Sequence, residues 1–349
     1  MPNENLKDSE KNYLESIYSY PKQFKEAWEK SLKIEFPFEY GNISDVIIAG
    51  MGGSAFGGFL LKSVFSDEKV LVPVEVVNQY ELPGYADERT LVLVTSYSGN
   101  TEETLSIIKQ AKVRGCKIAV ITSGGKLKNL LSSENYPGHI FSSSLNPSGA
   151  PRTSIGYLLG ATLGVLSNLK LLNFTNKEAL ETIKYIENFT KYLAKDNKLV
   201  VQMTQKIYGT APIFVTAEHL TASAHIWRNF FNETSKNIGF LYEIPEMNHH
   251  FLDSLSYPAE IKPNLSFIFI KSELYNERNK KRMEITRQVI KKSGFNDISI
   301  ILSSNSKINQ AWELIIIGSL VSYHMAKIHG ANPSSNEFVD YLKEKLSKA

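Results

Sequence analysis

The sequence predicts an α/β protein with two doubly wound domains, each a mostly parallel sheet covered by helices on both faces. Three observations support this fold class. Short strands rich in β-branched residues alternate with helical segments in both halves of the chain, and such alternation builds parallel sheets. A glycine-rich turn follows the first strand, at the edge where such sheets bind ligands. The length of 349 residues fits two domains of about 150–175 residues each.

The first half begins with a helical region and continues as a regular alternation. We expect the first 35 residues to be helical because Tyr13, Ile17, Phe24 and Trp28 recur at near-helical spacing before Pro37. Strands are then predicted at 45–49, 73–77, 90–95, 117–122 and 139–142, and helices at 55–65, 102–114, from 124 and from 153.

The second half repeats this architecture without obvious sequence identity. Residues 177–205 are rich in Lys, Glu and Asn, and they predict amphipathic helices that join two domains, 1–175 and 176–349. Strands follow at 212–217, 239–242, 265–270 and 297–302, with helices at 222–236, 276–293, 309–328 and 336–346. Gly330 and Pro333 separate the last two helices.

Composition and charge exclude several classes of protein. The chain is 42% hydrophobic, too high for a disordered protein, and its 21 Gly and 13 Pro are too few for a collagen-like one. The net charge of +3, without any run of five Lys or Arg, predicts no nucleic-acid partner. The longest apolar stretches, 155–169 and 314–321, are shorter than the roughly 20 residues of a membrane span, so we expect buried helices and no membrane.

The N-terminus and the cysteine content indicate the compartment. Residues 1–10 are polar and charged and contain no apolar signal-peptide core. The single cysteine, Cys116, cannot form an intramolecular disulfide, and no Cys/His cluster has the spacing of a zinc site. We therefore expect a cytoplasmic protein without a bound metal.

The glycine turn at 50–53 is the first candidate ligand site. Glycines let the backbone approach an anion closely, and the helix that follows offers free N–H groups. The pattern Gly50-x-Gly52-x-x-Ala55 also matches a dinucleotide fingerprint, so a nicotinamide or flavin enzyme is an alternative. That fingerprint requires an acidic residue about 20 positions later, where this chain has Asn78-Gln79. A tight turn without a ligand is the third reading.

A stronger signal is the second strand-to-helix loop, residues 95–104. Ser96, Ser98 and Thr101 place three hydroxyls at a helix N-terminus, which is a favourable arrangement for a phosphate monoester. No Lys follows the glycine turn in the pattern of nucleotide-binding loops, so a nucleoside triphosphate is disfavoured. The alternative is that these hydroxyls only cap the helix, with Ser98 as N-cap.

Together these segments resemble a known family. GMGGSAFGG at 50–58 and TSYSGNTEET at 95–104 resemble the sugar isomerase (SIS) domain, and more specifically the bifunctional phosphoglucose/phosphomannose isomerases. The resemblance continues at TSGGKL (122–127), at the P-x-G-x-P-R motif (147–152), and at 232–236, 245–249 and 342–343. It implies two SIS-type, flavodoxin-like domains, a hexose 6-phosphate substrate, no cofactor, and a homodimer with shared active sites.

The resemblance also implies roles for individual residues. It places the sugar phosphate on Gly52, Gly53, Ser54, Ser96, Ser98 and Thr101. It places Arg152 near the reacting carbons, where its charge can stabilise an enediolate. Glu233 matches the catalytic base, and His249 matches a ring-opening histidine that reaches in from the partner subunit. Lys343 matches a lysine that assists ring opening, with Lys345 as the alternative.

The chemistry of aldose–ketose isomerisation requires groups of these types. One carboxylate must accept and return a proton between C2 and C1, and ring opening requires an acid/base pair near neutrality. Phe230 and Phe231 predict that Glu233 lies at a largely buried helix end, although a solvated carboxylate is the alternative. Arg152 opens an apolar helix, where its charge opposes the helix dipole unless an anion lies beside it.

The sequence departs from the family pattern at four places. Asn78-Gln79 replaces Arg-Asp, Ile226 replaces an Arg, Phe251 replaces a Glu, and 334–336 lack a Thr. The predicted function is interconversion of fructose 6-phosphate with glucose 6-phosphate or mannose 6-phosphate. The alternative, favoured by Ile226 and Phe251, is a non-catalytic sugar-phosphate sensor.

Overall fold

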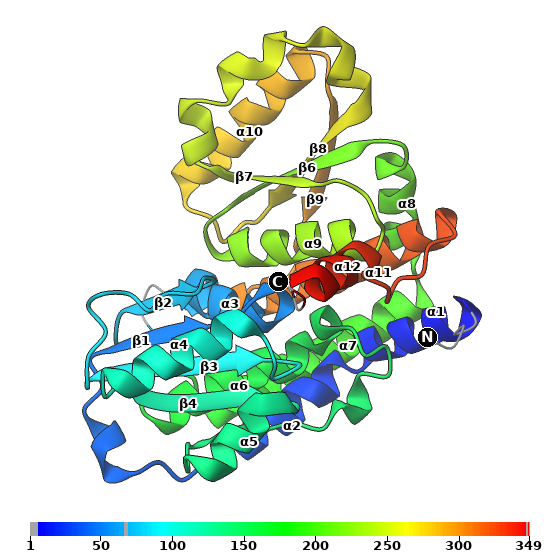
Figure 1. The fold of residues 1–349 in the computed structure, drawn as a ribbon. Helices are drawn as coiled ribbons and strands as arrows, with labels where there is room; N and C mark the ends of the chain where they lie inside the picture. The colour runs from blue at the N-terminus through cyan, green and yellow to red at the C-terminus, as the bar shows by residue number, and fades with distance from the viewer. Residues whose placement is uncertain (1–5, 66–68, 347, 349) are drawn as a thin grey trace.

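The computed structural model describes residues 6–65, 69–346 and 348. Its strands form two sheets, one above the other in Figure 1, with helices between and around them. The first sheet contains β1 (Asp45–Ala49), β2 (Val74–Val77), β3 (Thr90–Ser96), β4 (Lys117–Thr122) and β5 (Gly138–Ile140). The second contains β6 (Ala211–Ala217), β7 (Phe240–Ile244), β8 (Leu265–Lys271) and β9 (Asn296–Ile301).

Both sheets are parallel and share one topology. The strand order is β2-β1-β3-β4-β5 in the first sheet and β7-β6-β8-β9 in the second, and every paired neighbour is parallel. In each sheet the strand order reverses beside the first strand, which is β1 in the first sheet and β6 in the second. In the first sheet, the loops that follow β1 and β3 therefore lie next to each other at one edge. This is where open α/β sheets bind their ligands. The predicted fold class is confirmed.

The helices agree with the predicted ones except at some boundaries. They are α1 (Leu6–Tyr18), α2 (Tyr20–Ser31), α3 (Phe56–Phe65), α4 (Glu102–Val113), α5 (Gly125–Ser133), α6 (Ile155–Asn168), α7 (Asn176–Lys195), α8 (Lys198–Ile207), α9 (Thr221–Glu233), α10 (Glu277–Lys292), α11 (Lys307–Ile328) and α12 (Glu337–Leu346). The N-terminal region forms two helices because Pro21 has no N–H to continue α1, whereas it fits the first turn of α2.

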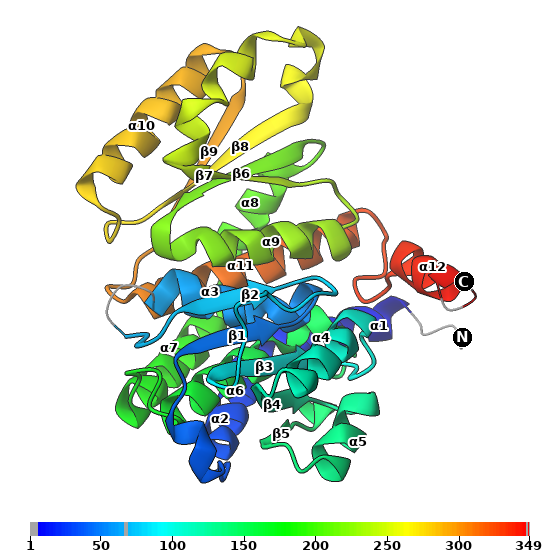
Figure 2. The ribbon, with the colours of Figure 1, turned by 60° about the vertical axis from the view of Figure 1, so that its left-hand side comes forward.

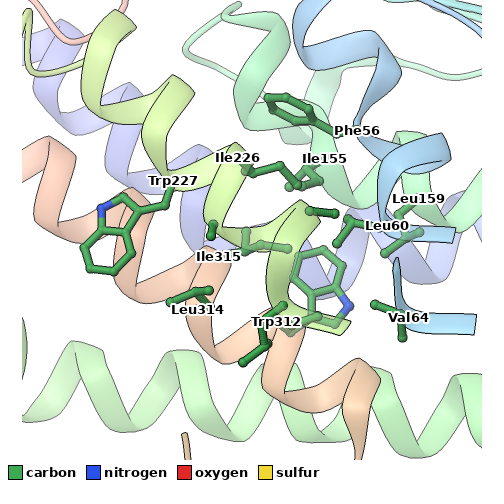
Figure 3. Close-up of a cluster of buried hydrophobic side chains, with 14 of the residues drawn as sticks. Phe56, Leu60, Val64, Ile155, Leu159, Ile226, Trp227, Trp312, Leu314 and Ile315 are labelled. Carbon is green, nitrogen blue, oxygen red and sulfur yellow. The ribbon is translucent and has the colours of Figure 1, made fainter. Parts of the chain in front are cut away.

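A layer of helices between the two sheets fixes the position of the candidate site. Figure 3 shows α3, α6, α9 and α11 meeting there, with Phe56, Ile155, Ile226 and Trp312 among the buried side chains. Each fully buried side chain of this size contributes about 1.5–3 kcal/mol to stability. Because α3 follows the glycine turn and Glu233 ends α9, this packing holds both beside one another.

No helix of residues 6–65, 69–346 and 348 is both long and apolar enough to cross a membrane. The apolar stretches at 155–169 and 314–321 lie in α6 and α11, whose residues are mostly buried. Figure 2 shows α12 standing away from the body of the protein, and none of its residues is buried.

Candidate active site

The glycine turn brings Arg152 to the edge of the first sheet. Residues Gly52–Ala55 form a 3₁₀ helix, η2, before α3 begins. A Cβ atom on Gly53 would lie 3.0 Å from the backbone nitrogen of Arg152, which belongs to a second 3₁₀ helix, η4 (Pro151–Ser154). Glycine at 53 therefore allows two segments about 100 residues apart in the sequence to pack backbone against backbone.

The second strand-to-helix loop gathers hydroxyl groups at the same edge. The Ser96 Oγ lies 2.9 Å from the Thr101 Oγ1 and accepts a hydrogen bond from the Gly99 backbone N–H at 3.1 Å. The Ser98 side chain is exposed, and its Oγ accepts from the Asn100 N–H at 3.3 Å. We call residues 96–101 the hydroxyl loop.

The helix that follows the hydroxyl loop has no side-chain cap. Its N-cap residue is Thr101, whose hydroxyl bonds Ser96 and makes no capping hydrogen bond. The alternative in which Ser98 caps α4 is therefore wrong. Because the first N–H groups of a helix have no partner within it, the N-terminus of α4 suits an anion.

Two further contacts join the hydroxyl loop to its neighbours. The Tyr97 N–H donates to the Ser54 Oγ at 3.0 Å, which ties the loop to the glycine turn. Gly99 has a φ of +68°, and a Cβ there would lie 1.8 Å from the Gly124 carbonyl oxygen. Only glycine fits this position. The predicted phosphate-binding residues of the two loops thus come together on one edge.

Asn78 stands where a dinucleotide-binding enzyme requires an acidic residue, and it makes a structural hydrogen bond instead. The Asn78 Nδ2 donates to the Gly50 carbonyl oxygen at 2.7 Å, so this amide supports the glycine turn. An amide in that place lacks the carboxylate that would accept hydrogen bonds from a ribose. The contact therefore favours the phosphate reading of the glycine turn over the nicotinamide or flavin alternative.

Arg152 and Glu233 form an ion pair between the two halves of the chain. The Arg152 Nη1 donates to the Glu233 Oε2 at 3.0 Å and to the Asn336 Oδ1 at 3.0 Å. Its Nε donates to the Thr234 Oγ1 at 3.0 Å, and its Nη2 donates to the Pro333 carbonyl oxygen. Since the Arg152 side chain is only 1% exposed, these acceptors replace the water that it loses on burial. The anion expected beside Arg152 is present, as the carboxylate of Glu233.

Glu233 lies at a largely buried helix end but keeps access to a pocket. Phe230 and Phe231 are buried as expected, but the Glu233 side chain is 33% exposed because α9 ends there and the carboxylate faces a pocket. The pocket measures about 480 Å³, and Lys236, Asn336 and Phe338 also line it. The helix end is therefore largely buried, as predicted, and the carboxylate still reaches the pocket. A carboxylate that is both anchored and accessible can reach a bound substrate.

Lys236 faces the same pocket. Its ammonium group donates to the Glu233 carbonyl oxygen at 2.7 Å and to the Ser335 carbonyl oxygen. Burial, assisted by the nearby charge of Arg152, lowers the pKa of Lys236. These two contacts link the end of α9 to the segment that leads into α12.

His249 lies apart from the Arg152–Glu233 pair. It is exposed in a 3₁₀ helix, η6 (Glu246–His249), which follows β7. Its neighbour Asn248 donates to the Thr286 Oγ1 of α10 at 2.7 Å, which fixes this turn on the second sheet. Among the described residues, those that line the Glu233 pocket do not include His249.

Lys343 also lies away from the pocket, on the exposed α12. The alternative lysine, Lys345, has its ammonium group 5.3 Å from the centre of the Tyr341 ring. The structure thus joins Arg152 to Glu233, whereas His249, Lys343 and Lys345 are not among the residues that line the Glu233 pocket.

Comparisons with known proteins follow this division into two halves. Residues 42–129 match the SIS domain family, and residues 196–346 match the family described as the bacterial phospho-glucose isomerase C-terminal SIS domain. A bifunctional phosphoglucose/phosphomannose isomerase from Caldicellulosiruptor bescii is 33% identical over 341 residues, which cover 96% of this chain and 98% of that protein. The chain belongs to this isomerase family.

Other relatives agree with this membership. A bifunctional phosphoglucose/phosphomannose isomerase from Thermoplasma acidophilum is 28% identical and covers 90% of this chain and 94% of its own. The crystal structure of a hypothetical protein from Thermus thermophilus has the same fold, with a TM-score of 0.74 at 14% identity over 98% of this chain and 94% of that one. The resemblance seen in the sequence motifs is confirmed.

Two departures from the family pattern serve packing in this member. Ile226 is fully buried in the helix layer of Figure 3. Phe251 packs on the Tyr242 ring, with the two ring centres 4.3 Å apart. Within the described residues, no three His, Cys, Asp or Glu side chains group so that they could hold a metal ion.

Three contributors to the candidate active site were not predicted from the sequence. Thr234 lies in a family motif but carried no expected role, Asn336 was named only as a departure from the family pattern, and Tyr13 was expected only as part of the N-terminal helical region. The Tyr13 hydroxyl lies 2.6 Å from the Thr234 Oγ1, across 221 residues of sequence. No local pattern signals a contact between such distant residues.

Proposed function

We propose that the protein is an aldose–ketose isomerase that interconverts fructose 6-phosphate with glucose 6-phosphate, mannose 6-phosphate or both. The observation that carries the proposal is the Arg152–Glu233 ion pair. It lies beside the edge of the first sheet because the backbone of Arg152 packs against Gly53. Phosphate recognition at that edge and a carboxylate base beside it are the two components that this reaction requires.

In the proposed mechanism the sugar phosphate binds to the hydroxyl loop and the glycine turn. Glu233 removes the proton from C2 of the open aldose phosphate and returns it to C1, while the C2 hydroxyl proton moves to the C1 oxygen. Arg152 holds Glu233, and its charge stabilises the enediolate intermediate. The scheme uses side chains alone, so we expect activity to survive dialysis against EDTA.

A coupled assay with each hexose 6-phosphate tests the proposal. We expect interconversion of fructose 6-phosphate with at least one of the two aldose phosphates. If the folded protein interconverts none of them but gains thermal stability from hexose phosphates, it is a sugar-phosphate sensor and the proposed activity is wrong. The ratio of initial rates with the two aldoses measures the sugar preference.

The proposal extends to a homodimer in which His249 of the partner subunit opens the sugar ring, assisted by Lys343. The exposure of His249 and its separation from the Glu233 pocket support a role across an interface. We further propose a cytoplasmic location, supported by the lone, buried Cys116, and a division into domains 1–175 and 176–349. The capping box of Thr175 and Glu178, which starts α7, supports that boundary.

Ser98→Ala is expected to weaken binding of every hexose phosphate by about 1–3 kcal/mol, because one donor to a charged group is lost. The loss should be equal for glucose and mannose phosphates, since the phosphate is remote from C2, where the two differ. Isothermal titration measures both affinities. Ser106→Ala is the matched control, because that hydroxyl bonds the Tyr80 carbonyl at 2.9 Å on the side of α4. A changed epimer preference at unchanged affinity would argue against this placement of Ser98.

Mixing Glu233→Gln protein with His249→Ala protein is expected to restore activity. One of the two sites in a mixed dimer then has both groups intact, and about half of the dimers are mixed after random exchange. Mixing Glu233→Gln with Arg152→Met is the control, because both substitutions lie on the same chain's side of the site and no site is intact. If activity does not return although exchange is shown by mass spectrometry, the shared site is disproved.

A further inference from the structure

The first helix, α1, contacts the candidate active site although it lies outside both matched family segments, 42–129 and 196–346. Its Tyr13 is fully buried, and the hydroxyl lies 2.6 Å from the Thr234 Oγ1. The same Thr234 oxygen accepts the Nε–H of Arg152 at 3.0 Å. The guanidinium carbon of Arg152 lies 5.7 Å from the centre of the Tyr13 ring.

We propose that Tyr13 and Thr234 are positioning residues that hold the Arg152 guanidinium, and through it the Glu233 carboxylate, in the orientation needed for proton transfer. This inference rests on the proposed function, in which Glu233 is the base. It assigns to the N-terminal helix a part in the reaction that neither SIS domain supplies.

The hydrogen bonds of Arg152 explain why one anchor matters. A guanidinium is planar, so its orientation is set by the acceptors around its edge. On the Nη side those acceptors are Glu233 and Asn336, which line the pocket described above, and the carbonyl of Pro333, which lies between pocket residues in the sequence. On the Nε side the acceptor is Thr234, which is fully buried and lies away from solvent. The hydrogen bond to Thr234 therefore fixes the orientation of the Arg152 guanidinium plane.

Tyr13 in turn fixes Thr234. A threonine hydroxyl can rotate about its Cα–Cβ bond, and the contact with Tyr13 selects the rotamer that faces Arg152. Burial raises the pKa of the Tyr13 phenol, so it stays protonated at neutral pH and acts as a neutral hydrogen-bonding group. It is consequently suited to positioning and not to accepting the substrate proton.

The rest of α1 is attached to the elements around the pocket. The Tyr13 ring stacks on Tyr323 of α11, with ring centres 6.3 Å apart and planes 6° from parallel. One turn earlier, the Ser9 hydroxyl donates to the Asn332 Oδ1 at 2.5 Å, in the segment before α12. The helix thus holds together α11, the end of α9 and the segment carrying Pro333 and Asn336. Tyr13 stays in place even if its hydroxyl is removed.

Tyr13→Phe tests the inference, because it keeps the stacked ring and removes only the hydroxyl. We expect kcat to fall about tenfold, since small displacements of a catalytic group cost rate steeply. KM should stay nearly unchanged, because the hydroxyl loop and the glycine turn bind the phosphate. Thr234→Val should lower kcat to a similar extent. Thr234→Ser, which keeps the hydroxyl, should retain most of the wild-type kcat.

Tyr20→Phe is the matched control. Tyr20 is also fully buried, and its hydroxyl lies 3.2 Å from the Ser319 Oγ of α11; within the part of the chain that the structure describes, it makes no hydrogen bond to Arg152 or Thr234. A loss of stability alone would lower the thermal midpoint of both Tyr→Phe variants and leave kcat unchanged in both. The inference predicts that only Tyr13→Phe lowers kcat.

A double-mutant cycle shows whether Tyr13 acts through Arg152. In an Arg152→Lys background the Nε–H is absent, so Tyr13→Phe should reduce kcat by less than twofold further, well below its effect alone. Two results would overturn the inference: a kcat for Tyr13→Phe equal to that of Tyr20→Phe, or a full additional loss in the Arg152→Lys background. If Tyr13→Phe does not fold, the Thr234→Val and Thr234→Ser pair decides the question. A Glu233→Gln variant that keeps full turnover would refute the proposed function instead, so the two failures are distinguishable.

Discussion

Glu233→Gln is expected to lower kcat by about 10²–10⁴ and to leave KM nearly unchanged, the range that a positioned general base contributes. The amide keeps the shape of the side chain, and its oxygen can still accept the hydrogen bond that the Arg152 Nη1 now donates to the Glu233 Oε2. The other hydrogen bonds of Arg152, to Thr234, Asn336 and Pro333, do not involve residue 233. The substitution therefore removes the base and preserves the architecture.

Deuterium exchange separates this prediction from a loss of substrate binding. In deuterated water the wild-type protein should introduce deuterium at C2 of the aldose phosphate, and the Gln variant should not. Glu187→Gln is the control, since that carboxylate lies on the surface of α7 and pairs with Lys191 at 2.6 Å. Near-normal turnover and exchange in Glu233→Gln would make the carboxylate structural and the proposed mechanism wrong.

Features set by local sequence could be predicted. The hydroxyl loop spans only six residues, so the arrangement of its serines and its glycine and the start of α4 could be predicted from one short stretch of sequence. The strands β1, β3 and β4 were found because both faces of each strand are buried, which requires continuous apolar residues. Boundaries were less certain where packing decides them. Strand β7 was expected at 239–242 and runs from Phe240 to Ile244, because its pairing with β6 continues to Ile244.

Features set by long-range contacts could not be predicted. An anion beside Arg152 was expected on electrostatic grounds, but no pattern indicated that the carboxylate of Glu233, 81 residues away, would supply it. The two phenylalanines before Glu233 predicted a largely buried helix end, but no local pattern indicated that the carboxylate would also line a pocket. The periodicity that places Tyr13 in the core says nothing about which polar group its hydroxyl will meet.

Arg152→Met is expected to lower both kcat and the free energy of unfolding. Methionine fills similar volume but cannot donate a hydrogen bond, so the buried Pro333 carbonyl loses its donor, whereas the Thr234 hydroxyl keeps its contact with Tyr13. A buried group that loses its partner costs about 1–3 kcal/mol, so the free energy of unfolding should fall by about that amount. The value of kcat should fall by at least as much as in Tyr13→Phe, because Glu233 loses its ion-pair partner as well as its orientation.

Arg152→Lys distinguishes charge from geometry in the same experiment. Lysine keeps the positive charge but has one compact ammonium group, which cannot reach Thr234 and Glu233 at the same time as the planar guanidinium does. Its stability, measured by urea unfolding, should lie between those of the wild type and Arg152→Met. Glu233→Gln should lower kcat and leave the free energy of unfolding nearly unchanged, whereas Arg152→Met should lower both. A surface substitution usually changes the free energy of unfolding by no more than about 0.5 kcal/mol. If the value for Arg152→Met differs from that of the wild type by no more than this, Arg152 does not hold the two halves of the site together.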